Sequence, residues 1–151
     1  MENCCGHHNC IEELTADHQK ILAELDKLEQ NPEGHAKEFL KFTESFAEPH
    51  HHKEEEVLFP ALEKKGKPRD GGPIGMMLSE HETKRGLVKE LRKATEEGND
   101  GKIKENALAI VSLLRDHISK EDNILYPCAK DFLNEEELGE LAHKCEEIKA
   151  H

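Results

Sequence analysis

The sequence predicts an all-α protein, an up-down-up-down four-helix bundle with a short C-terminal fifth helix. Glu, Lys, Leu and Ala dominate the chain between sparse Gly and Pro positions, and β-branched runs are few. Apolar residues recur at helical spacing in four long segments joined by short loops, which is typical of a bundle. At 151 residues, the chain has the length of one domain that can bury a core.

The first two helices are expected at about residues 11–29 and at about 35–59 or a turn beyond. The first has one inward face at strict heptad spacing, made by Ile11, Leu14, His18, Ile21, Leu25 and Leu28. The second has an inward face made by Phe39, Thr43, Phe46, His50, Glu54, Val57 and Ala61. Pro49 and Pro60 interrupt this second pattern, and each removes an amide donor, so a kink is expected there.

The third helix is expected to open after Gly72, with Pro73 in its first turn, where proline is well tolerated. The fourth comes after the loop at residues 99–101. A short fifth helix is expected at about 134–149, where Asn134 is the N-cap and a Glu stands at the third helical position. No segment carries the alternating pattern of a strand.

Charge and composition exclude several classes of function. Asp plus Glu number 33 against 21 Lys plus Arg, a net charge of −12, which is the wrong sign for binding nucleic acid. No apolar stretch approaches the roughly 20 residues of a membrane span, and the N-terminus lacks a signal-peptide pattern. We therefore expect a cytoplasmic protein with the five Cys as thiols or metal ligands. Two parts are expected: a Cys/His-rich tail at 1–10 and the bundle at 11–151.

Two stretches, residues 50–60 and 117–127, match without a gap in their His, Lys, Glu, Leu and Pro positions. Each places a His and a Glu four residues apart, hence on one face of a helix. A weaker match links the surroundings of His18 and His81. The pattern indicates two copies of a helical hairpin, each with one His followed by one His-x-x-x-Glu pair.

The repeated residues occupy core positions at a common height in the bundle. A buried carboxylate without a partner costs several kcal/mol, so a cation between these groups is the favoured explanation, and a hydrogen-bonded polar layer is the alternative. Imidazole with carboxylate suits iron, manganese or zinc, and two matching sets favour two ions. Without metal, we expect the Glu pair to be pushed toward protonation and the crowded His to resist charging. The predicted ligands are His18, His50, Glu54, His81, His117 and Glu121.

This pattern, His18, His50-x-x-x-Glu54, His81 and His117-x-x-x-Glu121, resembles the hemerythrin-like, or HHE cation-binding, domain over about residues 11–130. The resemblance implies a non-haem di-iron centre with an oxo or hydroxo bridge. It further implies Glu54 and Glu121 as bridging ligands and the four His as terminal ligands, with zinc or manganese as substitutes for iron. Relatives bind oxygen, sense oxygen or iron, or act on nitric oxide and peroxide.

One departure from that family bears on function. Oxygen-carrying hemerythrins have an extra His on the third helix, four residues from the first, and Met77 and Arg85 occupy those positions here. Four His leave vacant or water-filled positions on both metals, which favours redox chemistry over reversible oxygen carriage. The paired pattern also resembles proteins that repair iron centres, which carry a Cys pair before the domain. Here Cys4, Cys5 and Cys10 are either such a soft-ligand or electron-transfer cluster or part of a disordered tail.

The remaining candidate residues are expected to be structural. Three other His do not fall on the inward helix face that contains His50 and should be at the surface, namely His35, His51 and His52. His51 would compete with His50 for the metal site if Pro49 rotates the helix locally. Tyr126 should pack beside Pro127, and a hydrogen bond to the site is the second interpretation. The two remaining Cys should be small core or boundary residues, and they are Cys128 and Cys145.

Three functions stay open. The favoured one is a di-iron oxidoreductase that handles nitric oxide, oxygen or hydrogen peroxide, in stress defence or the repair of iron centres, with an unidentified electron donor. The second is an oxygen or iron sensor or binder without turnover, for which the chain offers no output domain. The third is a storage or structural metal site, although one layer of six ligands holds only two ions.

Overall fold

The computed structural model describes residues 9–67 and 72–148, and in these residues all regular structure is helical, with no strand. Its elements form four long rods and one short helix. The first rod is α1 (Cys10–Gln30) and the third is α5 (Pro73–Glu97). The second rod joins α2 (Pro32–Phe42), the π segment η2 (Thr43–Ala47), α3 (Glu48–Lys53), η3 (Glu54–Leu58) and α4 (Phe59–Lys64). The fourth joins α6 (Asp100–Lys120), η4 (Glu121–Leu125) and α7 (Tyr126–Phe132), and the short helix is α8 (Glu135–Glu146).

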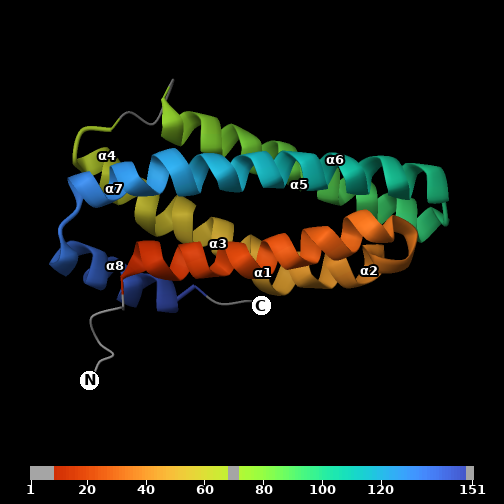
Figure 1. Ribbon diagram of the computed structural model, residues 1–151, viewed down its shortest axis with the longest axis horizontal. Coiled ribbons are helices and arrows are strands. Elements are labelled where there is room, and N and C mark those ends of the chain that lie inside the picture. The colour runs from red at the N-terminus through yellow and green to blue at the C-terminus, as the bar shows by residue number, and fades with distance from the viewer. Residues whose placement is uncertain (1–8, 68–71, 149–151) are drawn as a thin grey trace.

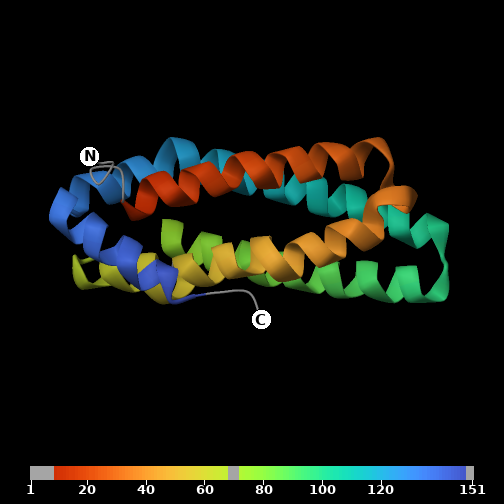
Figure 2. The same cartoon turned by 90° about the horizontal axis from the view of Figure 1, so that it is seen from below.

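The rods lie side by side along the long axis of the molecule (Figures 1 and 2). The first rod packs against α2 and α6, and α5 packs against α2 and α6 as well, so the rods enclose a common interior. The short helix α8 packs against α1 and η3 near one end of the bundle. The predicted all-helical bundle is therefore confirmed, with helix starts close to those expected from the sequence.

Asparagine side chains define the starts of four helices. Each accepts a hydrogen bond from a backbone N–H of the first turn, and this satisfies one of the donors that a helix start leaves unpaired. The capping residues are Asn9, Asn31, Asn99 and Asn134, and the last forms the full capping box predicted for α8. Gly98 ends α5 with a φ of 66°, a left-handed conformation that glycine adopts without steric cost.

Each π segment is followed, after one residue, by a proline at position 49, 60 or 127. Proline has no amide hydrogen, and its ring crowds the carbonyl four residues back. At all three places the residue before the proline donates its N–H to the carbonyl five residues back, which makes a wider turn. The three bonds run from Glu48 to Thr43, from Phe59 to Glu54 and from Tyr126 to Glu121. The distortion predicted at Pro49 and Pro60 takes this form.

The apolar interior is divided into two clusters. One contains Ile11 and Leu14 of α1 together with residues of η3, α4, α7 and α8. The other contains Ile21 and Leu25 of α1 together with residues of α2, α5 and α6. Between them is a layer of buried polar side chains, which we call the polar layer. Its members are His18, His50, His51, Glu54, His81, His117 and Glu121.

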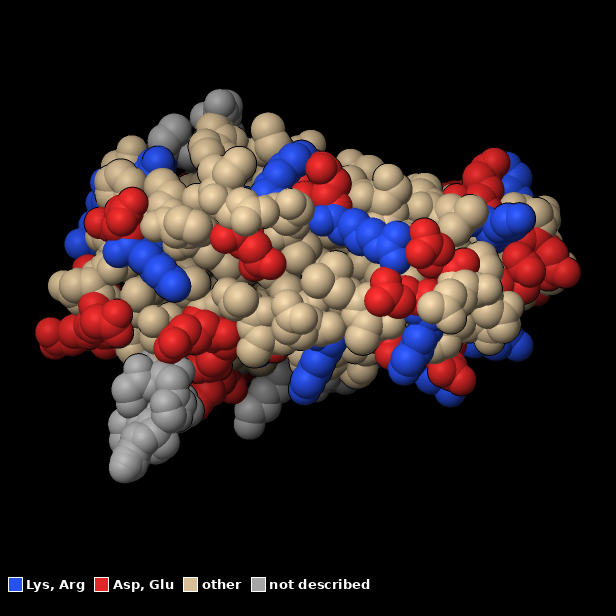
Figure 3. All heavy atoms as spheres, in the orientation of Figure 1, with Lys and Arg blue, Asp and Glu red and all other residues tan. Residues whose placement is uncertain are grey.

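Acidic and basic side chains lie intermingled on the face of the molecule seen in Figure 3. Opposite charges also join neighbouring rods, since the Arg115 guanidinium of α6 lies 2.7 Å from Asp26 and 2.9 Å from Glu29 of α1. Among the described residues, no helix is both long enough and apolar enough to span a membrane.

Candidate metal centre

All six ligands predicted from the sequence lie together in the polar layer. His18 is on α1, His50 on α3, His81 on α5 and His117 on α6, so each rod contributes one imidazole. Glu54 and Glu121 are the first residues of η3 and η4. None of the six is more than 1% exposed to solvent. The structure thus brings two carboxylates and four imidazoles from the whole length of the chain into one buried site.

The potential ligand atoms form two overlapping groups, and within each group they lie within 4.8 Å of one another. Glu54 belongs to both groups, so its carboxylate lies close to both sets of ligand atoms. Glu121 belongs to the first, but its second carboxylate oxygen lies 3.3 Å from His117 Nε2 of the second. The first group is His18, His50, Glu54 and Glu121, and the second is His51, Glu54, His81 and His117.

Six buried nitrogen and oxygen atoms in the polar layer have no hydrogen-bond partner. Buried polar atoms are almost always hydrogen-bonded, because an unpaired one retains its full desolvation cost. Four of these atoms face one another, as His81 with Glu54 at 3.1 Å and His117 with Glu121 at 3.3 Å. Nitrogen and oxygen atoms that converge in this way without hydrogen bonds fit cations between them, and imidazole nitrogen with carboxylate oxygen is a donor set that suits iron, manganese and zinc. The six are His50 Nε2, His51 Nδ1, Glu54 Oε1, His81 Nε2, His117 Nε2 and Glu121 Oε2.

Four carboxylates outside the polar layer hold the four predicted His in position. Each accepts a hydrogen bond from a His Nδ1, which directs the opposite nitrogen inward, as in many metal sites. We call these contacts the carboxylate ring, because each joins one rod to the next and the last returns to the first. The ring consists of Asp17 to His50 at 3.0 Å, Glu55 to His81 at 2.7 Å, Glu80 to His117 at 2.8 Å and Asp122 to His18 at 2.8 Å.

Sequence reasoning missed the carboxylate ring, although a signal for it exists. Every ring carboxylate is the chain neighbour of a predicted ligand, as Asp17 is of His18 and Glu55 is of Glu54. Because neighbouring residues on a helix point about 100° apart, the carboxylate faces the adjacent rod and serves a His there. The pattern therefore becomes informative only when the order of the rods around the bundle is known.

His51 is buried, and the prediction that it lies at the surface is wrong. Its side chain is 2% exposed and its ring lies 4.2 Å, centroid to centroid, from that of His81. The cause is the π turn in η2, which adds a residue to the turn and shifts the phase of the helix after it. Ala47 is buried at 1%, whereas Phe46, the expected inward residue, is only half-buried. After this shift both His50 and His51 border the interior.

The fifth imidazole changes the comparison with oxygen-carrying hemerythrins. The chain lacks their extra His on the third helix, and of the two residues in its place Met77 is buried in the apolar cluster. Arg85 pairs with Glu48 and Glu55. His51 nevertheless adds a fifth imidazole from the second rod. The polar layer therefore contains five imidazoles, one more than the sequence predicted.

Tyr126 contacts the site directly, so packing beside Pro127 is not its whole role. Its hydroxyl donates a hydrogen bond of 2.6 Å to Glu54 Oε2, the carboxylate common to both groups. Its ring stacks on His18 with centroids 5.3 Å apart and planes 8° apart. Burial, together with the charges of Glu121 and Glu54, raises the pKa of the phenol well above its usual value. Tyr126 therefore stays a neutral donor to Glu54.

In the metal-free chain the titration of the five His is uneven, contrary to the expectation that all resist charging. Burial lowers the pKa of His50 and, more strongly, of His51. Burial also opposes charging of His81, but Glu54 and Glu55 outweigh it and raise its pKa to about 9. The same balance raises the pKa of His18 and of His117 through Glu121. Glu121 is not pushed toward protonation either, because its neighbours overcome the effect of burial and lower its pKa.

The other candidate residues lie apart from the polar layer. The His52 side chain is 44% exposed and that of His35 is 12% exposed, so the surface prediction fits His52 better. Cys145 is buried and Cys128 is partly buried, as predicted. Cys10 is the first residue of α1 and buried, and contact with Cys145 together with burial raises the pKa of its thiol. Cys4 and Cys5 lie outside the described residues.

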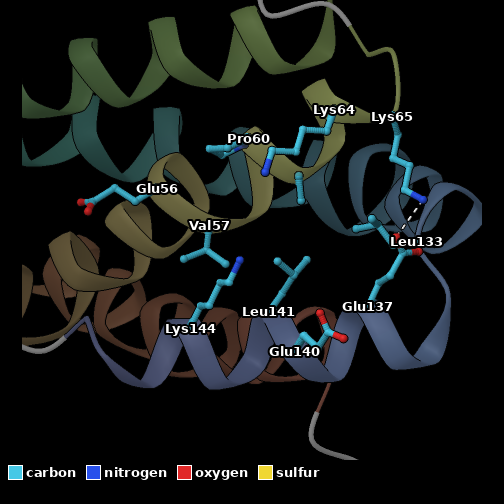
Figure 4. Close-up of a pocket in the computed structure, with 11 residues that line it drawn as sticks. Glu56, Val57, Pro60, Lys64, Lys65, Leu133, Glu137, Glu140, Leu141 and Lys144 are labelled. Atoms are coloured by element: carbon cyan, nitrogen blue, oxygen red, sulfur yellow. Dashed lines mark ion pairs between the residues drawn. The ribbon is translucent and has the colours of Figure 1, made fainter.

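A separate cavity of about 270 Å³ lies between α8 and the η3–α4 part of the second rod (Figure 4). Val57, Leu133 and Leu141 contribute apolar lining, and an ion pair of 2.7 Å joins Lys65 to Glu137 at one side. No member of the polar layer lines this cavity. It is therefore distinct from the metal centre.

Comparison with known families agrees with this site. A family model for the hemerythrin HHE cation-binding domain matches residues 9–129. The chain belongs to this family. The match includes all seven residues of the polar layer, the four residues of the carboxylate ring and Tyr126. No curated protein and no solved structure matches the chain significantly. The hemerythrin domain here thus contains a buried His/Glu cluster able to bind metal.

Replacing either carboxylate of this hemerythrin domain should remove iron, whereas replacing an exposed His beside them should not. Glu54→Ala and Glu121→Ala delete groups that contact both sets of ligand atoms. His52→Ala is the matched control, because the ion pairs of His52 within residues 9–67 and 72–148 are to Glu56 at 3.0 Å and Glu55 at 3.9 Å on its own rod. Elemental analysis after expression with added iron measures the effect. Iron loss in His52→Ala equal to that in the Glu variants would contradict the assignment.

Metal uptake by the metal-free protein should release protons and strengthen as pH rises from 7 to 9. His81 is charged at pH 7 because its pKa is raised to about 9, and it must lose that proton to bind a cation. Each displaced proton increases the apparent affinity about tenfold per pH unit. Charged His81 stabilises the metal-free fold fully at pH values below the pKa that this His has in the unfolded chain. This stabilisation is lost as pH rises through about 9, the pKa of His81 in the folded chain. Zinc titrations against a competing chelator at three pH values test this, and a flat profile would contradict it.

Tyr126 should not ionise when the folded, metal-free protein is taken through pH 10. The chain has one Tyr and no Trp, so phenolate absorbance near 295 nm reports this residue alone. Its pKa is raised well above the usual value by burial and by the nearby carboxylates. The same titration in denaturant should show ionisation near pH 10. Equal titration curves in the two states would mean that the phenol does not donate to Glu54.

Proposed function

We propose that this hemerythrin domain is a non-haem di-iron protein that binds or reacts with nitric oxide, oxygen or hydrogen peroxide. The observation that carries the proposal is the set of six unpaired buried atoms in two overlapping ligand groups. One ion would be held by His18, His50, Glu54 and Glu121, and the other by His51, Glu54, His81 and His117. Iron in these positions supplies redox-active centres to which small molecules bind, and zinc or manganese would occupy them without the same redox chemistry.

The residues of the chain prepare the site for such ligands. Apolar clusters on both sides of the polar layer exclude bulk water. Tyr126 keeps its proton at the hydroxyl oxygen and directs it at Glu54 Oε2, which orients the shared carboxylate. The carboxylate ring fixes the four anchored imidazoles with one nitrogen turned inward. The up-down-up-down order that we propose for the rods places the two His-x-x-x-Glu pairs on alternate rods.

Access for a small apolar molecule is supported by a cavity of about 310 Å³ beside α5 and η4. Its lining includes Met77 and Leu125, which are one helical turn from His81 and Glu121 respectively. Both side chains are buried in the apolar cluster next to the polar layer. This lining favours oxygen or nitric oxide over larger polar substrates, and electrons would need a separate donor. The proposal includes a cytoplasmic location, in which Cys10, Cys128 and Cys145 would stay thiols.

A second candidate function is an oxygen or iron binder or sensor without turnover. His51 supports it, because it adds an imidazole to the four predicted ones, as the extra third-helix His does in oxygen-carrying hemerythrins. The two functions differ in whether the bound small molecule is converted. Single exposure to oxygen or nitric oxide followed by removal of the gas would return a binder to its starting spectrum, whereas an enzyme would be left oxidised and would need a reductant.

Purification without oxygen after expression with added iron should give close to two iron ions per chain. Absorption spectra recorded with oxygen, nitric oxide and hydrogen peroxide in turn should then each change, because the ligands leave positions for small molecules. Glu54→Ala serves as the control for adventitious iron. One ion or none in the unmodified protein, or spectra that no small molecule alters, would contradict the proposed function.

A further inference from the structure

His51 differs from the other four imidazoles of the polar layer in one respect. The other four each have a carboxylate on Nδ1, at distances between 2.7 and 3.0 Å. For His51 the buried atom without a partner is Nδ1, which is therefore its inward nitrogen and leaves Nε2 as the outer one. Among the described residues, no ion pair with a carboxylate involves His51. It is held only by ring contacts, to His81 at 4.2 Å, to His50 at 5.4 Å and to His117 at 5.8 Å.

This difference has a direct consequence for ligand strength. A carboxylate on the outer nitrogen makes an imidazole a more basic ligand and prevents its ring from turning, and losing it typically costs 10–100-fold in metal affinity. His18, His50, His81 and His117 have this support, and His51 does not. Ring contacts orient His51 but do not increase its basicity. His51 is therefore the weakest of the five imidazole ligands.

The surroundings of His51 also favour a negative charge in its place. Lys84 lies one turn beyond His81 on α5, is 2% exposed, and acts on His51 electrostatically. Its ammonium pairs with Glu48 at 2.9 Å, and both residues line a cavity of about 130 Å³. Close to a buried cation, an anion is stabilised more than a neutral imidazole. This side of the polar layer thus combines a weak ligand with a buried, carboxylate-paired ammonium, behind which the cavity begins.

We propose that His51 is the exchangeable ligand of this centre, which a small anion or diatomic molecule replaces at the ion held by Glu54, His81 and His117. The inference rests on the proposed function, since it requires two bound ions. It assigns the two ions different roles. The ion held by His18, His50, Glu54 and Glu121 has both of its imidazoles anchored, so it keeps its ligands while the other ion exchanges one.

Azide is a suitable probe because it is a small anion whose binding to iron is seen by absorbance. The iron-loaded full chain would be compared with His51→Ala and with the matched control His50→Ala, which removes the neighbouring, anchored imidazole. We expect His51→Ala to keep two ions and to bind azide more tightly. If His51 occupies its position nine-tenths of the time, the gain is about tenfold. Added imidazole should compete with azide in His51→Ala. His50→Ala should lose metal.

Two further measurements keep the result decisive. His51→Leu fills the same volume without a ligand atom, so it replaces the Ala variant if that variant fails to fold. In the zinc-loaded unmodified protein, relaxation-dispersion NMR should show exchange at the His51 ring and not at the His50 ring. Unchanged azide affinity in both His51 variants, or the loss of an ion from them, would overturn the inference. The proposed function fails separately, if the unmodified protein does not hold two iron ions.

Discussion

The carboxylate ring is the interaction on which the rest of this bundle depends. Burying five imidazoles and two carboxylates in one layer is costly unless each group has a partner. The ring supplies partners on the outer side of four His, and it does so with carboxylates that are themselves 17 to 30% exposed and therefore still partly hydrated. Because every contact joins neighbouring rods, the same bonds that orient the imidazoles also fix the rods relative to one another.

The division of the apolar interior is a consequence of this arrangement. The polar layer crosses the bundle completely, so the buried apolar side chains form one cluster on each side of it rather than a single continuous core. Each cluster contains residues from all four rods. The cluster that contains Tyr126 also includes α8, which packs against α1 and η3 near that end of the bundle. The short fifth helix therefore has a structural reason to be present, in addition to burying its own apolar face.

Helical periodicity was sufficient to predict the four rods, α8 and six members of the polar layer, because these depend on residue spacing within one helix. It was insufficient for His51, since the π turn in η2 changes the phase between Thr43 and His50. It was also insufficient for Tyr126, whose hydroxyl reaches Glu54 on another rod. The ring carboxylates could not be assigned for the same reason, because their partners lie across the bundle. The features that the sequence did not predict depend either on contacts between different rods or on the local change from an α turn to a π turn.

The prolines are the local cause of that change of turn. In both copies of the repeat, Glu54 and Glu121 stand four residues after their His at ordinary helical spacing and also begin a π segment. The bond that closes each π turn returns to the carbonyl of that same Glu, from Phe59 and from Tyr126. The widened turn therefore begins only after the ligand pair is complete. It leaves His and Glu on one face and shifts the phase of the next helical turn, so that Phe59 and Tyr126 both enter the apolar cluster. Their rings stack on His81 and His18, with centroids 6.1 and 5.3 Å apart, and the Tyr126 hydroxyl also reaches the shared carboxylate. A proline at the same offset thus places an aromatic ring against a buried His in both copies, and the phenol adds a hydrogen bond to the shared carboxylate in one of them.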